Sequence, residues 1–151
     1  GEVAIAAPLR DRLGAVADLK RRVSPMPEAL VRSVVQDRLW QVEFGLKAFA
    51  PKFAATGDVY GVAGCLARFA HALVLTLFAL NRVYLLNDKT ALREIDAFAV
   101  APSAFGARLK DALAAIGKEP AQQTAALAAM TALFEDTRER AGALYAAPWR
   151  F

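Results

Sequence analysis

Residues that commonly carry catalysis are scarce in this chain. It has one cysteine, Cys65, and one histidine, His71, among its 151 residues. A lone cysteine excludes an internal disulfide and a cysteine-rich zinc site, and it is consistent with a reducing compartment. No serine or cysteine lies at a suitable helical step from His71, which argues against a hydrolase triad. We therefore expect a cytoplasmic protein, with Cys65 as a small core residue and no catalytic residue in this chain.

Motifs for metals and phosphates are also missing. The acidic pairs 94/96 and 135/136 have no further ligands at useful spacing, so solvated helix faces explain them better than a metal site. No glycine-rich phosphate loop follows a strand. The net charge of +4 is spread along the chain, so it supports nucleic-acid binding weakly and suits a few anionic phosphates better. We expect neither a metal nor a cofactor to be bound by this chain alone.

Apolar residues, by contrast, make up 56% of the sequence. Alanine and leucine dominate, while β-branched runs are scarce and glycine and proline are sparse within segments. This composition favours helices over strands. A chain of 151 residues is long enough for one domain with a sizeable core. The predicted fold is therefore all-α, an antiparallel helical bundle with a long central helix.

Apolar spacing and helix breakers divide the chain into three long and three short helices. We expect these over about 8–23, 27–53 with a bend or end at Pro51, 58–85, a short stretch after 87–88, 102–117 and 120–144. Residues 1–7 alternate weakly, as a strand does, and are expected to be a residual linker or strand from an upstream domain. Residues 8–151 then form a single helical bundle domain.

The third predicted helix raises a membrane alternative, because its apolar stretch reaches the ~20 residues that a membrane span needs. Arg68 and His71 lie in the middle of this stretch. A central arginine costs ~2.5 kcal/mol or more on insertion scales, and neither an aromatic belt nor a basic cluster flanks the segment. We therefore expect a buried bundle helix and no membrane partner.

Two glycines inside the same helix are unusual, because each costs about 1 kcal/mol relative to alanine. Gly61 and Gly64 share one helical face with Arg68 and His71. One explanation is the close approach of a ligand. The other is tight helix packing, with Arg68 paired to an acid. The residues alone leave both open.

The turn over 81–89 is a second candidate site. It brings Arg82, Tyr84 and Lys89 to the end of a long apolar helix. A lysine in that position can neutralise a phosphate, although lysines at helix ends are commonly just solvated. The residues alone leave both interpretations open, a phosphate-binding lysine and a solvated lysine at a helix end.

Several runs together resemble a known family. These are PEAL at 27–30, GDVYGVAGCLAR at 57–68 and LFALN at 77–81, followed by Tyr84 and NDK at 87–89. They resemble the C-terminal helical half of bacterial proteins in the polymerase-β-like nucleotidyltransferase superfamily, which includes the aminoglycoside and lincosamide nucleotidyltransferases. The resemblance covers roughly the last five-sixths of the chain.

The resemblance implies a division of labour between two domains. In that family an N-terminal α/β domain carries a Gly-Ser motif and a metal-binding acid pair, and the helical domain closes over the nucleotide and holds the acceptor. This chain has no Gly-Ser followed by Asp-x-Asp. The resemblance therefore implies Mg²⁺ and a nucleoside triphosphate for a full-length parent, and an upstream nucleotidyltransferase domain of the same polypeptide as partner.

For the site, the resemblance implies that Lys89 and Tyr84 reach the nucleotide, and Asp58 and Arg68 are the next candidates. Because Arg68 and Lys89 would lie about 30 Å apart on an unbroken helix, we expect separate roles, with Lys89 and Tyr84 on phosphate and Asp58 with Arg68 nearer the domain interface or a small-molecule acceptor. All four are expected on a concave surface facing the upstream domain. A homodimer is a further candidate assembly. The alternatives are a non-catalytic helical interaction or dimerisation module and, ranked last, a helical ribonuclease, because Arg68 and His71 have only two residues between them.

Overall fold

The structure is a computed structural model that describes residues 1–149, and that range contains helices and no β-strand. The elements are α1 (Glu2–Ile5), α2 (Ala15–Val23), α3 (Glu28–Ala48), α4 (Ala50–Thr56), α5 (Val59–Leu80), α6 (Ala91–Ile95), α7 (Phe105–Ala114), α8 (Pro120–Ala141) and a 3₁₀ turn, Gly142–Leu144. The predicted all-α fold with a long central helix is confirmed.

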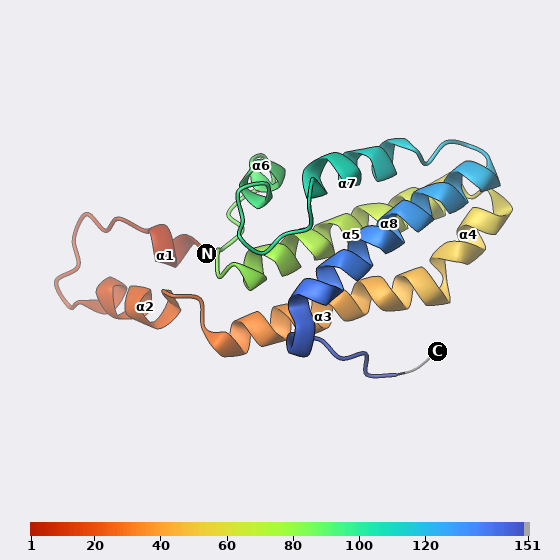
Figure 1. Ribbon diagram of the computed structural model, residues 1–151. Coiled ribbons are helices and arrows are strands. Elements are labelled where there is room, and N and C mark those ends of the chain that lie inside the picture. The colour runs from red at the N-terminus through yellow and green to blue at the C-terminus, as the bar shows by residue number, and fades with distance from the viewer. Residues whose placement is uncertain (150–151) are drawn as a thin grey trace.

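Helix α5 forms the centre of the bundle and contacts α3, α4, α6, α7 and α8. Helix α3 runs antiparallel to it, and α7 runs antiparallel to α8 (Figure 1). Because α6 and α7 lead the chain back to the end where α5 begins, α5 and α8 run in the same direction. The bundle is therefore antiparallel for the α3–α5 and α7–α8 pairs and parallel for the α5–α8 pair.

The hydropathy of α5 has a packing explanation. By length and composition this helix could cross a membrane, but 67% of its apolar window is buried inside the bundle. Leu66, Leu73 and Leu77 are fully buried. The core helix of a bundle is expected to be apolar on more than one face.

A glycine sets the close approach of α3 and α5. A Cβ built on Gly45 would lie 2.3 Å from Phe69 Cε1, which is far inside van der Waals contact. Phe69 is buried, and so are Leu39 and Val42 on the same face of α3. The ring of Phe69 therefore fills the space that a side chain at position 45 would need.

The end of α5 differs from the prediction, which extended the helix to Leu85. The helix ends at Leu80, and Arg82 has a left-handed backbone with φ of 57°. The amide of Asn81 explains the stop, because its Nδ2 donates to the carbonyls of both Leu77 and Val100 at 2.8 Å. A partner 19 residues away thus ends the helix.

The segment after α5 holds the connection between α2 and α3. The Tyr84 hydroxyl donates to the Val23 carbonyl at 2.8 Å, and Arg82 Nη1 donates to the Met26 carbonyl at 3.1 Å. Arg82 also forms an ion pair with Glu28. These contacts attach the N-terminal segment to the bundle.

The N-terminal segment differs from the expectation in two respects. The part expected to be a residual linker or strand contains one helical turn, α1, and the helix expected from Pro8 begins only at Ala15, after Gly14 in a left-handed conformation. Leu9 and Leu13 are 106% and 94% exposed, so burial of these side chains does not stabilise a helix there. Helices α1 and α2 pack on each other beside the bundle (Figure 1).

Candidate functional site

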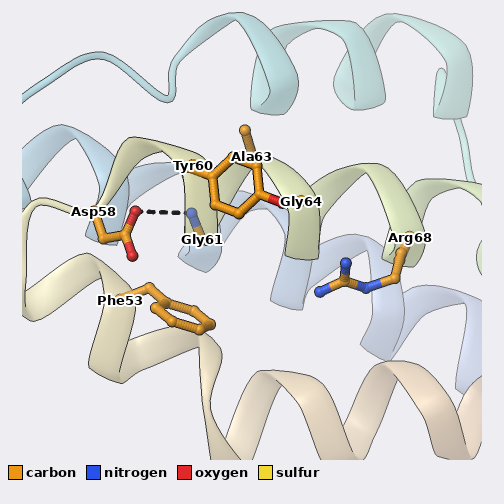
Figure 2. Close-up of a pocket in the computed structure, with 7 residues that line it drawn as sticks. All are labelled: Phe53, Asp58, Tyr60, Gly61, Ala63, Gly64 and Arg68. Carbon is orange, nitrogen blue, oxygen red and sulfur yellow. Dashed lines mark hydrogen bonds between the residues drawn. The ribbon is translucent and has the colours of Figure 1, made fainter.

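A pocket of about 490 Å³ opens between α4 and the first half of α5. Figure 2 shows its lining residues, which are Phe53, Asp58, Tyr60, Gly61, Ala63, Gly64 and Arg68. Its volume lies within the usual range for small-molecule sites, roughly 300–1,000 Å³. Two of the four predicted site residues, Asp58 and Arg68, therefore line one pocket.

The turn into α5 places Asp58 at one end of this pocket. Gly57 ends α4 with a left-handed φ of 71°, and Asp58 is the N-cap of α5, its Oδ1 accepting a hydrogen bond from Gly61 N at 2.9 Å. A left-handed glycine commonly ends a helix, and an aspartate commonly caps the N-terminus of the next one. Within residues 1–149, no hydrogen-bond donor occupies Oδ2, so the carboxylate retains accepting capacity at the pocket.

Arg68 lies at the other end. Its guanidinium extends back along the pocket toward Gly64 and Phe53 (Figure 2). Among residues 1–149, no carboxylate lies within 4.0 Å of it, and its hydrogen-bonding contact is with Cys65 Sγ at 3.6 Å. Pairing of Arg68 with an acid, one of the two explanations drawn from the sequence, is therefore not found in the described chain.

Cys65 is fully buried, as predicted for a core residue. Burial raises the pKa of its thiol, and the Arg68 guanidinium only partly opposes that shift. A protonated, buried thiol is a poor nucleophile and a poor metal ligand.

The two glycines of α5 have different explanations. A Cβ on Gly61 would lie 2.5 Å from the ring of Phe53, so that glycine permits close packing of α4 on α5. A Cβ on Gly64 would meet only Arg68 Nη1, at an ordinary 3.5 Å. Among the described residues, no other helix comes within 4 Å of the Cβ position of Gly64, and its bare backbone borders the pocket instead.

Tyr84 and Lys89 lie near the opposite end of α5, outside this pocket. The Tyr84 hydroxyl donates a hydrogen bond to the Val23 carbonyl, and the Tyr84 ring lines a separate groove of about 150 Å³. Lys89 is exposed, and its backbone N donates to Asn87 Oδ1 at 3.0 Å. The four residues expected on a single concave surface therefore occupy two places, Asp58 and Arg68 at the α4–α5 pocket, Tyr84 and Lys89 beyond the other end of α5.

His71 lies on the exposed side of α5, with Nδ1 4.0 Å from Asp88 Oδ1. It does not line the α4–α5 pocket. In the described residues, no group of three or more His, Cys, Asp or Glu side chains could hold a metal ion.

Sequence reasoning missed a polar cluster where the C-terminal segment meets α3. Glu43, only 7% exposed, accepts hydrogen bonds from Lys47 and from the Tyr145 hydroxyl. Burial opposes ionisation of Glu43, yet the hydrogen bonds from Lys47 and Tyr145 hold its pKa below the ordinary value. Gln36 exchanges two hydrogen bonds with the backbone of Ala146, at 2.8 and 3.1 Å. No local signal reveals partners 102 and 110 residues apart.

Comparison with known proteins gives one relationship. No curated protein and no solved structure matches the chain. The family described as Domain of unknown function (DUF4037) matches residues 2–89, more than half of the sequence. The match includes the α4–α5 pocket, Tyr84 and Lys89. The chain therefore belongs to the DUF4037 family.

Proposed function

We propose that this chain is the substrate-binding helical domain of a nucleotidyltransferase-like protein, and that the α4–α5 pocket holds the acceptor. The observation that carries the proposal is the pocket itself. It joins Asp58 and Arg68, the two residues expected nearer the domain interface or acceptor, in a volume of about 490 Å³. Neither Oδ2 of Asp58 nor the Arg68 guanidinium is neutralised by an ion pair with a described residue.

In this proposal the residues that follow the C-terminal end of α5 bind the nucleotide. Lys89 is exposed and has three ammonium donors for a phosphate. Tyr84 has already committed its hydroxyl proton to Val23, so its contribution would come from the half-buried ring. Arg82 is engaged with Glu28 and Met26 and is left out of the nucleotide contacts.

Transfer chemistry would come from the upstream domain. Nucleotidyl transfer needs metal ions, held by acids, to offset the charge on the leaving pyrophosphate. The predicted role of this chain is to orient the acceptor group, which by positioning alone can supply a large part of a rate enhancement. Mg²⁺ and the nucleoside triphosphate accordingly belong to the parent protein.

The test compares this chain with a polypeptide that also carries the upstream nucleotidyltransferase domain. The longer protein is expected to transfer a nucleotide with Mg²⁺, and the chain alone is not. In the longer protein, Arg68→Gln should raise the KM for the acceptor and leave the KM for the nucleotide unchanged, while Lys89→Gln should do the reverse. Transfer by the chain alone, or an unchanged acceptor KM in Arg68→Gln, would contradict the proposal.

A non-catalytic interaction or dimerisation module is the second candidate. It is favoured by the α1–α2 segment, which packs beside the bundle and leaves Leu9 and Leu13 almost fully exposed. Both lie in the loop between α1 and α2, and exposed apolar side chains mark an interaction surface when they form a contiguous patch. Sedimentation of the chain and of a Leu9→Ser, Leu13→Ser double variant tests it: the candidate requires a dimer that the double substitution dissociates.

A further inference from the structure

We infer that the α4–α5 pocket binds a small zwitterion, with the cationic group of the ligand against Asp58 and its anionic group against Arg68. The inference deepens the proposed function, since it names the chemical class of the acceptor. The ligand class follows from the residues that line the cavity.

The Asp58 end selects a hydrogen-bond donor. Its Oδ1 is used by Gly61 N, which fixes the carboxylate in place. The remaining oxygen, Oδ2, has no donor among residues 1–149. A carboxylate only accepts hydrogen bonds, so an ammonium or a hydroxyl satisfies it and an anion does not.

The Arg68 end selects an anion. Arginine presents five donors in a planar fork that matches a carboxylate or a phosphate. The single described contact of this guanidinium, with Cys65 Sγ at 3.6 Å, leaves most of those donors unused. Arg68 lies ten positions after Asp58, about 15 Å between Cα atoms on a helix, and the Arg68 side chain extends back toward Asp58 (Figure 2). The two charges therefore face a common space that a small molecule can bridge.

The middle of the pocket is apolar. Phe53, Ala63 and the bare backbone of Gly64 border it, and Tyr60, at 90% exposure, presents its ring beside them. Tyr60 and Gly64 are four residues apart and so are neighbours on the helix surface. An apolar or aromatic middle section on the ligand would cover these groups and displace water from them.

The two ends together determine the class of ligand. A simple anion that binds Arg68 is repelled by the Asp58 carboxylate. A simple cation that binds Asp58 is repelled by the Arg68 guanidinium. A molecule with both charges at opposite ends of an apolar section gains at each end. This pattern distinguishes a zwitterion from a plain carboxylate, phosphate or amine.

Calorimetric titration of the chain with three matched probes tests the inference. The probes are 4-(aminomethyl)benzoate, which has both charges, 4-methylbenzoate, which has only the anion, and 4-methylbenzylamine, which has only the cation. The zwitterion should bind about tenfold or more tightly than either single-charge probe, the scale of one charged hydrogen bond. Equal affinity of 4-methylbenzoate and the zwitterion, or no measurable binding of the zwitterion, overturns the inference.

Variants locate the binding to the pocket. Asp58→Asn keeps an oxygen to cap α5, and it should lower the affinity for the zwitterion to that for 4-methylbenzoate. Arg68→Gln should lower it to that for 4-methylbenzylamine. Gly64→Met should fill the pocket and abolish binding while preserving the fold, because position 64 is helical and open. Arg93→Gln, at an exposed position of α6, is the control and should bind like the parent chain. Unchanged binding in Gly64→Met would place the ligand elsewhere and overturn the assignment.

These results separate the two proposals. Zwitterion binding with no transfer activity in the longer polypeptide would overturn the proposed function and support the inferred site. Transfer activity whose acceptor KM responds to Arg68→Gln but not to Asp58→Asn would overturn the zwitterion and support the proposed function.

Discussion

Asn81 and Val100 exchange two hydrogen bonds: Asn81 Nδ2 donates to the Val100 carbonyl at 2.8 Å, and Val100 N donates to Asn81 Oδ1 at 3.1 Å. The same amide also donates to the Leu77 carbonyl at the end of α5. One side chain therefore both ends the central helix and fixes the connection between α6 and α7.

The first prediction concerns this amide. Asn81→Ala should lower the free energy of unfolding by about 1–3 kcal/mol, since the carbonyl and the N–H of Val100 lose their partner, while the Leu77 carbonyl keeps only the Asn81 backbone N. Asn81→Asp keeps an acceptor for Val100 N but places a carboxylate oxygen against the carbonyls of Leu77 and Val100, so it should be no more stable than Asn81→Ala at neutral pH. Urea denaturation checks the order, and an Asn81→Ala protein as stable as the parent would contradict it.

The second prediction contrasts two glycines. Gly45→Ala should destabilise the chain by about 1–3 kcal/mol, because the new Cβ overlaps the buried Phe69 ring. Gly64→Ala should stabilise it by about 0.5–1 kcal/mol, because alanine is the better helix former and the site is open. The melting temperatures of the two variants should move in opposite directions; a fall in both would show that Gly64 also serves packing.

A third prediction follows from Glu43. Its pKa in the folded chain is lowered, so its ionised form contributes stability that is present above its ordinary pKa of 4.5 and is lost as the pH falls through the lower, folded value. Glu43→Gln should therefore reduce the loss of stability on acidification. Denaturation at several values between about pH 3 and pH 7 measures this, with Glu139→Gln, an exposed residue on α8, as the control.

Gln123 gives a fourth prediction. It is completely buried, and neither amide atom has a hydrogen-bond partner within the described residues. Gln123→Met keeps the length of the side chain and removes the unsatisfied groups, so it should raise the free energy of unfolding by about 1 kcal/mol or more. A lower melting temperature in this variant would contradict the expectation.

The fifth prediction concerns Lys89 in the longer, nucleotide-binding polypeptide. Lys89→Ala should weaken nucleotide binding by about 1–3 kcal/mol, the scale of a hydrogen bond to a charged group. Because Lys89 is exposed, its loss should leave the melting temperature nearly unchanged. Calorimetry measures the affinity, and an unchanged value would remove Lys89 from the nucleotide site.

Local chemistry made part of this structure predictable. Gly57 and Asp58 end one helix and cap the next through contacts within a few residues, so the start of α5 could be predicted from sequence. Pro51 likewise lies in the first turn of α4, where the break was expected. The helical class followed from composition and spacing.

The errors arose where contacts between residues far apart in sequence determine the structure. The stop of α5 depends on Val100, and the docking of the C-terminal segment depends on Gln36 and Glu43, all far from their partners in sequence. The start of α2 was misplaced because apolar spacing at Leu9 and Leu13 indicated burial that the bundle does not provide. Periodicity shows which residues could share a face, but it does not show that a surface exists to cover that face.

The candidate site could be predicted only in part, because spacing along one helix does not show how another helix packs on it. The helical face that carries Gly64 and Arg68 could be read from spacing, and both line the pocket. That Phe53 fills the space beside Gly61, and leaves Gly64 open, required the packing of α4 on α5. Tyr84 was assigned to a ligand, while the structure gives its hydroxyl a partner in Val23.

The parallel course of α5 and α8 has an electrostatic consequence. Their N-termini meet at the same end of the bundle, where a Cβ on Gly57 would lie 3.6 Å from both the Lys118 carbonyl and Pro120. Two helix N-termini side by side each carry a partial positive charge, roughly half an elementary charge, and repel one another. An acid caps each of them, Asp58 on α5 and Glu119 on α8, so the paired macrodipoles are offset at the end of the molecule that contains the pocket.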